Sequence, residues 1–222
     1  MLNGIKKLYT KIDPFTARRR EQLRAGLENR DFTLITSNCI GGIIYHELGL
    51  EFKSPTINLM ITTDEFARFV LDLPGYLDKK LRFIESQENY PVAMLGDVEI
   101  SFTHYHTQEE AEEKWEARKR RICWDNLFLL FNDRDGITEQ QMEEIGRLQY
   151  RGIVMLSAKE RRSVPYALYM DCYAGEPCVG NVLKKSFPTE IRQFERYFDY
   201  VKWFNESNGG DYTCEKYRLK GK

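Results

Sequence analysis

The chain has 222 residues, and 42% of them are hydrophobic, which is enough to bury one sizeable core. Lys and Arg number 33 against 34 Asp and Glu, so the net charge of −1 gives no overall field to draw the protein to nucleic acid or to an acidic membrane surface. The five cysteines are odd in number and lack metal-site spacing, which argues against a disulfide framework and a structural zinc site and favours a cytoplasmic location.

Residues 1–222 are expected to form a single soluble domain. The first residues lack the continuous apolar core of a signal peptide, and no later stretch approaches the length of a membrane span. The first predicted element is a basic helix over residues 14–30, with Asp13 or Thr16 as its cap. Its arginines could meet phosphate or anionic lipid, but a solvated surface face is the expected role.

Residues 32–50 predict a strand, a small polar turn and a helix. The strand at 32–36 is apolar or β-branched, and Ile43, Ile44 and Leu48 recur at helical spacing. In the turn, a glycine pair lets backbone amides approach a ligand, and the helix start can hold an anion. The alternative is that the polar residues cap the helix and the glycines only turn the chain. The candidate ligand-binding residues of this turn are Ser37, Asn38, Gly41 and Gly42.

A second strand-and-helix unit follows. Residues 57–61 predict a buried strand, and Thr62 and Glu65 have capping-box spacing at the start of a helix. Two such units in a row favour a parallel sheet covered on both sides. A Gly96-Asp97 turn then predicts an antiparallel hairpin. The predicted fold class is therefore α/β, a single three-layer α/β/α domain with a mixed, mostly parallel sheet.

The second half of the chain continues the alternation. Residues 107–122 predict a helix with acids leading and bases trailing, as the helix dipole favours. Residues 127–131 are wholly apolar and predict a central strand buried on both faces. The remaining predicted elements are a helix at 138–148, a strand at 152–157, an edge strand at 166–169, a closing helix at 190–204 and a frayed tail at 206–222.

Polar clusters follow four of the predicted strands. Open α/β sheets bind ligands at the edge formed by the carboxyl ends of their strands, so we expect the four clusters to line one groove. The clusters lie at 37–39, 62–64, 104–106 and 133–135. In the second of them, Asp64 is a candidate ligand-binding residue.

His104 and His106 are candidate catalytic residues. If their strand persists, both imidazoles lie on one face, where they could place a general base beside an orienting partner or bind a metal. Two histidines do not complete a metal-ligand set, so no residue is assigned as a metal ligand. The alternative is a pair of hydrogen-bonded histidines at a strand end.

Asp133 and Asp135 follow the most apolar predicted strand. Many nucleotide-sugar transferases carry such an Asp-x-Asp pair to hold Mg²⁺ or Mn²⁺ against a diphosphate, and carboxylates are the hard ligands that these ions prefer. Asp133 is therefore a candidate catalytic residue and Asp135 a candidate ligand-binding residue. The alternative is that Asp-Arg-Asp-Gly is ordinary turn chemistry.

Cys39 and Arg118 complete the candidate residues. A thiolate at Cys39 would be stabilised by the dipole of the predicted helix, and a histidine could accept its proton, which would make Cys39 a nucleophile. The alternative is a small core residue. Arg118 shares a helical face with Lys114 and Arg121, so its guanidinium could reach the anion-binding edge, with solvated pairing to glutamate as the alternative.

Four sequence blocks together carry a family resemblance. They are Phe-Thr-Leu-Ile-Thr-Ser-Asn-Cys-Ile-Gly-Gly at 32–42, Ser-Pro-Thr-x-Asn-Leu at 54–59, Phe-x-His-Tyr at 102–105 and Asn-Asp-Arg-Asp-Gly at 132–136. In combination they resemble a bacterial family often labelled exopolysaccharide biosynthesis proteins, over roughly residues 14–205. The resemblance implies a three-layer α/β/α domain and an association with surface-glycan production. It brings no established reaction or catalytic residues.

Three functions fit these patterns. The first is a transferase of surface-glycan assembly that uses a phosphate-bearing sugar donor, with His104 or His106 as base and Asp133 or Asp135 on a cation or on sugar hydroxyls. The second is a non-catalytic glycan- or partner-binding module, and the third a Cys39-dependent acyltransferase or hydrolase. Each takes a small molecule or glycan, and the oligomeric state stays open. The candidate stacking residues of the second are Tyr45, Tyr105, Trp115 and Trp124.

Overall fold

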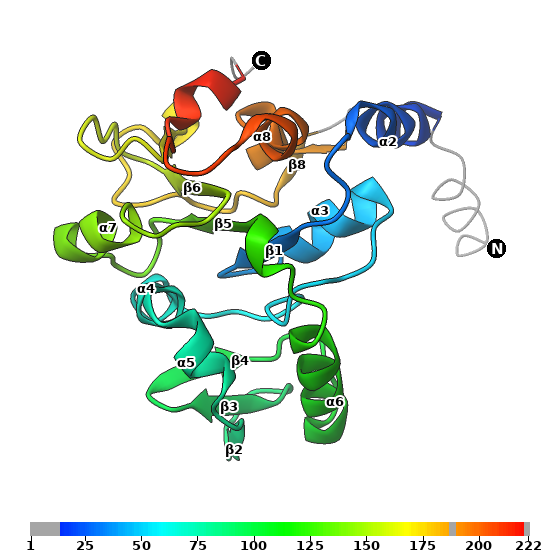
Figure 1. Ribbon diagram of the computed structural model, residues 1–222, viewed down its shortest axis with the longest axis vertical. Coiled ribbons are helices and arrows are strands. Elements are labelled where there is room, and N and C mark those ends of the chain that lie inside the picture. Colours follow the sequence, from blue (N-terminus) through cyan, green and yellow to red (C-terminus); the bar gives the residue numbers. More distant parts are fainter. Residues whose placement is uncertain (1–13, 187–189, 220–222) are drawn as a thin grey trace.

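A four-stranded parallel sheet forms the centre of the computed structural model, which describes residues 14–186 and 190–219 (Figure 1). The strand order is β1-β5-β6-β7, and each neighbouring pair is parallel. All residues of β1, β5 and β6 are buried, which explains why their sequences are almost continuously apolar or β-branched. The predicted α/β class is confirmed. The strands are β1 (Thr33–Thr36), β5 (Leu127–Asn132), β6 (Gly152–Ser157) and β7 (Ala167–Tyr169).

A smaller antiparallel sheet in the order β2-β3-β4 lies beside it. The predicted hairpin is confirmed, because β3 and β4 pair across a turn in which Gly96 has a φ of 68°. These strands form a sheet of their own, however, and do not extend the parallel sheet. Its strands are β2 (Arg82–Ile84), β3 (Val92–Leu95) and β4 (Val98–Ser101).

The predicted strand over residues 57–61 is wrong. This segment is a turn in which Asn58 has a left-handed φ of 62°, and an isolated bridge joins Met60 to Ser101. A left-handed residue interrupts the extended backbone that a strand needs, although Ile57, Leu59 and Ile61 are still buried. The segment links the two sheets because Ile61 N also donates to Ser37 O, at the end of β1 (2.9 Å).

Helices cover both faces of the parallel sheet, as Figure 1 shows. One hydrophobic core lies between the sheet and α4, α5, α6, α7 and the small sheet, with Phe66 and Phe131 at its centre. The other lies between the sheet and α3 and α8, where Phe128 packs on Trp203 at 4.9 Å between ring centroids. The helices are α2 (Pro14–Gly26), α3 (Ile40–Leu48), α4 (Thr63–Leu71), α5 (Leu73–Leu77), α6 (Gln108–Lys119), α7 (Glu139–Ile145) and α8 (Tyr200–Glu206).

The structure of residues 190–219 differs from the closing helix and the frayed tail predicted for this part of the chain. The closing helix is limited to α8, because residues 190–199 form a short strand and a 3-10 turn instead. The tail, predicted to fray, is packed as far as Leu219: Tyr212, Cys214 and Tyr217 are buried, and Cys214 N donates to Pro165 O at 3.0 Å. The short elements are β8 (Lys185–Ser186), β9 (Ile191–Arg192), η1 (Trp124–Asn126), η2 (Asp171–Tyr173), η3 (Phe194–Arg196) and η4 (Cys214–Tyr217).

The basic helix α2 does more than face solvent. Arg20 pairs with Glu47 of α3 and Arg19 with Glu195 of η3, each at 2.7 Å. Arg192 lies between the two carboxylates, at 3.3 Å from Glu47 and 3.7 Å from Glu195. Both glutamates are buried, so the arginines of α2 supply the positive charge that burying two carboxylates requires. None of the helices in residues 14–186 and 190–219 has the length and hydropathy of a membrane crossing.

Candidate functional site

The carboxyl edge of the parallel sheet brings together three of the predicted polar clusters. Thr36, the last residue of β1, pairs with Leu130 of β5, so the turn after β1 and the pair Asn132-Asp133 leave the sheet at neighbouring positions. The start of α4 joins them, because Thr63 Oγ1 donates to Asn132 O at 3.1 Å. Residues 37–39, 62–64 and 132–135 therefore meet at one edge, as the strand directions require.

The turn after β1 is held by its own polar groups. Asn38 Oδ1 accepts a hydrogen bond from Ile40 N at 3.0 Å, and Thr36 Oγ1 donates to Asn38 O at 2.8 Å. Ser37 is buried, whereas Asn38 and Cys39 are half-buried. The N-cap residue of α3 is Cys39, and Asn38, just before it, satisfies the first N–H of the helix, close to the capping role that the sequence left open. The amide nitrogen of Asn38 is the polar group it can still offer to a ligand.

Cys39 faces the turn that leads into the predicted cluster at 104–106. Its Sγ lies 4.0 Å from Thr103 Oγ1, in the turn that follows β4. Burial raises the pKa of the Cys39 thiol above its ordinary value, against the smaller lowering effect of the hydrogen bond with Thr103. The neighbour of Cys39 is thus a hydroxyl group, and the thiol is held in its protonated form at neutral pH.

Gly41 and Gly42 leave space that is filled by side chains of the protein rather than by a ligand. A Cβ added to Gly41 would lie 2.7 Å from Thr36 Oγ1 and 3.0 Å from Thr36 Cγ2. A Cβ added to Gly42 would lie 2.4 Å from Asn58 Oδ1. The two glycines therefore let α3 pack closely against β1 and against the turn at 54–59, so the first two sequence blocks are joined by close contact here.

We expect Gly41→Ala to lower the free energy of unfolding by about 1–2 kcal/mol, because buried, β-branched Thr36 cannot turn both of its branches away from the new methyl group. Gly42→Ala should cost less, since the tip of the Asn58 side chain can rotate. Gly26→Ala is the control, because its Cβ meets Val201 Cγ1 at an ordinary 3.6 Å. Urea unfolding of the three variants checks the order, and equal stability of Gly41→Ala and Gly26→Ala would contradict it.

The two histidines are not arranged as predicted. Strand β4 ends at Ser101, and residues 103–107 form turns, so the spacing of His104 and His106 does not place them on one strand face. Both are exposed. His106 lines a separate cavity of about 580 Å³ beside the loop between β2 and β3, and its backbone N donates to Glu110 Oε2 at 3.1 Å. His104 remains next to Thr103, which meets Cys39.

Asp133 is buried at the centre of a hydrogen-bond network. Its Oδ2 accepts from Ser157 Oγ at 2.8 Å and from Ala158 N at 3.0 Å, and its Oδ1 accepts from Val179 N at 2.9 Å. These donors come from the end of β6 and from the segment before β8. Both oxygens of Asp133 are therefore used to hold the loops of the carboxyl edge together, which suits a structural role better than metal binding.

The other two candidate aspartates have different surroundings. Asp64 accepts from Gln141 Nε2 at 2.8 Å and from Arg68 NH2 at 3.2 Å, so it joins α4 to α7. Asp135 is exposed and has a φ of 65°, as in a turn. Among residues 14–186 and 190–219, no group of three or more His, Cys, Asp or Glu side chains is placed to hold a metal ion.

Arg118 is buried and does not reach the carboxyl edge as a free cation. Its NH1 donates to Ile57 O at 3.3 Å and to the hydroxyl of Tyr105, and its guanidinium lies 5.2 Å from the ring centroid of Phe52. Tyr105 in turn donates to Ile57 O at 2.9 Å. Arg118 thus fixes the turns at 54–59 and 102–105 against α6. That Arg118 binds a ligand stays a prediction.

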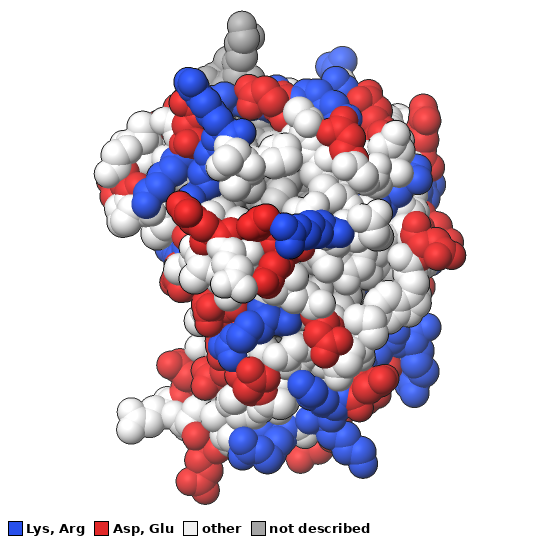
Figure 2. Space-filling model, turned by 60° about the vertical axis from the view of Figure 1, so that its left-hand side comes forward, with Lys and Arg blue, Asp and Glu red and all other residues white. Residues whose placement is uncertain are grey.

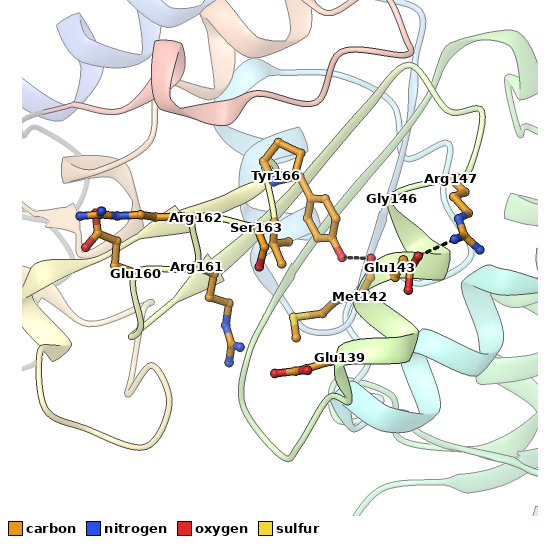
Figure 3. Close-up of a pocket in the computed structure, with 12 residues that line it drawn as sticks. Glu139, Met142, Glu143, Gly146, Arg147, Glu160, Arg161, Arg162, Ser163 and Tyr166 are labelled. Atoms are coloured by element: carbon orange, nitrogen blue, oxygen red, sulfur yellow. Dashed lines mark hydrogen bonds and ion pairs between the residues drawn. The ribbon is translucent and has the colours of Figure 1, made fainter.

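The structure also contains a cavity that the sequence did not reveal. It measures about 930 Å³ and lies between α7 and residues 160–166, which connect β6 to β7 (Figure 3). Arg161 lines it and donates from Nε to Ser157 Oγ at 3.3 Å, beside the Asp133 network. The charged run at 159–162 is visible in the sequence. The opposite wall of the cavity comes from α7, about twenty residues earlier, and no local sequence pattern shows that the two segments face each other.

Comparison with known proteins places these features in a family. A model for a domain of unknown function, DUF1919, matches residues 11–205. The chain belongs to the DUF1919 family. A relative from Haemophilus influenzae, named an uncharacterized protein, is 36% identical over 185 residues, which is 83% of this chain and 89% of the relative.

The DUF1919 match covers the parallel sheet, the sheet of β2-β3-β4 and all the residues of the carboxyl edge described above. Residues 206–219 lie beyond it, although they pack on the domain. On the face shown in Figure 2, basic and acidic side chains of the DUF1919 domain are interspersed, and neither sign forms a broad area. That surface therefore offers no extended electrostatic track for a polyanion.

Proposed function

We propose that this chain is a transferase of bacterial surface-glycan synthesis, which acts on a phosphate-bearing sugar donor at the carboxyl edge of its parallel sheet. The link to glycan synthesis comes from the four sequence blocks and the exopolysaccharide label of the proteins they resemble. The DUF1919 match and the relative from Haemophilus influenzae carry no stated function, so the reaction class rests on the site alone.

One observation carries the proposal: the four blocks meet around the start of α3. Thr36 N donates to Thr56 Oγ1 at 3.0 Å, which joins the first block to the second. Cys39 lies 4.0 Å from Thr103, which joins the first to the third. Asn132 and Asp133 leave the neighbouring strand. A helix start at such an edge is a favourable place for a phosphate group.

The residues can be given separate roles. The amide nitrogen of Asn38 and the backbone N–H groups of Gly41 and Gly42, in the first turn of α3, would hold the phosphate of the donor. His104, exposed in the turn that meets Cys39, is the side chain we assign as base. Since Asp133 is fully hydrogen-bonded and exposed Asp135 stands apart, we assign no protein-held Mg²⁺ or Mn²⁺; either ion would arrive with a diphosphate donor.

Thermal unfolding in the presence of UDP- and GDP-sugars, with and without Mn²⁺, tests the proposal. A donor at about a hundred times its Kd should raise Tm by roughly 5–10 °C. Asn38→Ala should abolish this shift, whereas His104→Ala should keep the shift and lose turnover. His46→Ala, in an exposed histidine on α3, is the matched control. The absence of a shift with any donor would overturn the proposal.

A non-catalytic glycan- or partner-binding module is the second candidate. It is favoured by the commitment of Asp133 to hydrogen bonds and by the raised pKa of Cys39, which leave few reactive groups at the edge. Of the four aromatic residues predicted to stack on a partner, Trp124 is 48% exposed, and the others are buried. In this case a glycan raises Tm without turnover, and Trp124→Ala removes the shift while His104→Ala does not.

A Cys39-dependent acyltransferase or hydrolase is a weaker candidate. The raised pKa of the thiol and its Thr103 neighbour provide neither a thiolate nor an adjacent base. Any activity that survives Cys39→Ser excludes this reaction class.

A further inference from the structure

The cavity between α7 and residues 160–166 has a built apolar wall. Met142 of α7 and Tyr166 are buried, at 3% and 1% exposure, and the Tyr166 hydroxyl donates to Met142 O at 2.7 Å. This bond ties the two sides of the cavity to each other, so its shape does not depend on a ligand. Val164 and Pro165 extend the apolar surface. A volume of about 930 Å³ is ample for a small organic molecule.

Three arginines and three glutamates line this cavity, and two of each form ion pairs with one another. Arg147 pairs with Glu143, and Arg162 pairs with Glu160 at 3.4 Å. These two pairs point away from the open space in Figure 3, whereas Arg161 and Glu139 point into it from opposite walls. In the part of the chain that the structure describes, neither Arg161 nor Glu139 forms an ion pair.

Arg161 is also held in place from behind. Its Nε donates to Ser157 Oγ, and Ser157 Oγ donates to Asp133, so the guanidinium is anchored to the sheet while its terminal amino groups remain available. A planar guanidinium with two free amino groups matches a carboxylate. Glu139, on the first turn of α7, can accept hydrogen bonds from an ammonium group.

The chemistry of the lining selects one class of ligand. A polyanion such as a nucleoside diphosphate would face three glutamates, and a polycation would face three arginines. One free cation and one free anion beside an apolar wall are complementary to a molecule with the same three features.

We propose that this cavity binds a zwitterionic small molecule with an apolar side chain, an apolar amino acid or a short apolar peptide, with its carboxylate on Arg161 and its ammonium group on Glu139. The site does not use the start of α3 or Asn38. It is therefore separate from the proposed donor site, and either proposal can fail without the other.

Isothermal titration calorimetry with four probes tests this assignment: L-leucine, the dipeptide Leu-Leu, leucinamide, which lacks the carboxylate, and 4-methylpentanoate, which lacks the amine. At least one zwitterion should bind, and both half-ligands should bind about tenfold or more weakly than it does. A half-ligand that binds as tightly as the best zwitterion would overturn the proposal, and so would failure of both zwitterions to bind at millimolar concentration.

Charge-neutral variants locate the site. Arg161→Gln and Glu139→Gln should each weaken the zwitterion about tenfold or more. Arg161→Gln should leave the affinity for leucinamide unchanged, because that probe has no carboxylate. Arg162→Gln is the matched control, since its charge is already paired with Glu160, and it should change affinity less than twofold. Equal losses of zwitterion affinity in Arg161→Gln and Arg162→Gln would contradict the site.

Because Glu139 is exposed, the Glu139→Gln variant tests the site without disturbing the hydrophobic core.

Discussion

Asp133→Asn is expected to lower the free energy of unfolding by about 3 kcal/mol. Asp133 is 5% exposed, and its carboxylate accepts hydrogen bonds from Ser157, Ala158 and Val179. An amide has one acceptor oxygen, so its NH2 group must face one of these donors and leave both groups unsatisfied in a buried place. Urea unfolding at pH 7 measures the loss.

The control is the same substitution two residues later. Asp135→Asn is exposed, and asparagine tolerates the left-handed φ of 65°, so its stability should match the wild type within about 0.5 kcal/mol. If Asp133 served catalysis alone, Asp133→Asn would lose turnover and keep its stability. That result would refute the structural role given to Asp133 here.

Glu47→Gln is the second substitution with a large expected effect, a loss of about 3 kcal/mol. Glu47 is 2% exposed and is the acid that Arg20 and Arg192 share, so its neutral replacement leaves Arg20 without its ionic partner and Arg192 with Glu195 alone. The estimate is at the low end for a buried pair because the Arg20 side chain is 34% exposed. Glu51→Gln, which removes the exposed partner of Arg121, should be nearly neutral.

The same carboxylate predicts a dependence of stability on pH. Burial by itself would raise the pKa of Glu47, but the hydrogen bond from Arg20 and the charges of Arg20 and Arg192 outweigh burial and hold the pKa below its ordinary value of 4.5. A lowered folded-state pKa means that the contribution is complete above the unfolded value and is lost as pH falls below about 4.5 through the folded value.

Unfolding free energies between pH 7 and pH 3 test this sign. The wild type should lose more stability than Glu47→Gln on the acid side, so the two curves converge there. Parallel curves over the whole range would show that the charge of Glu47 contributes nothing to folding.

The sequence predicted the sheet because its strands are buried on both faces. In β5, six consecutive buried residues leave a run that only a central strand explains. Two predicted elements were wrong because the backbone takes a conformation that the pattern of apolar residues does not reveal. Asn58 is left-handed, which ends the strand predicted at 57–61, and the helix predicted at 190–204 is shortened because Phe194 and Tyr197 are buried by a 3-10 turn instead.

The candidate site was predictable in its position but less so in its roles. Strand direction alone placed Asn38 and Asp133 at one edge. Nothing local showed that both oxygens of Asp133 would be taken by donors 24 to 46 residues away, or that Arg118 would be buried against Ile57. A side chain's availability depends on partners that arrive from elsewhere in the chain, and a single sequence does not name them.

The contact of Arg19 with Glu195 spans 176 residues. As the polypeptide leaves the ribosome, α2 emerges long before Glu195, one of its two acidic partners. Helix α2 therefore cannot dock completely until synthesis has passed Glu195. A nascent chain stalled before residue 190 should keep this helix accessible to proteases, and completion of synthesis should close it.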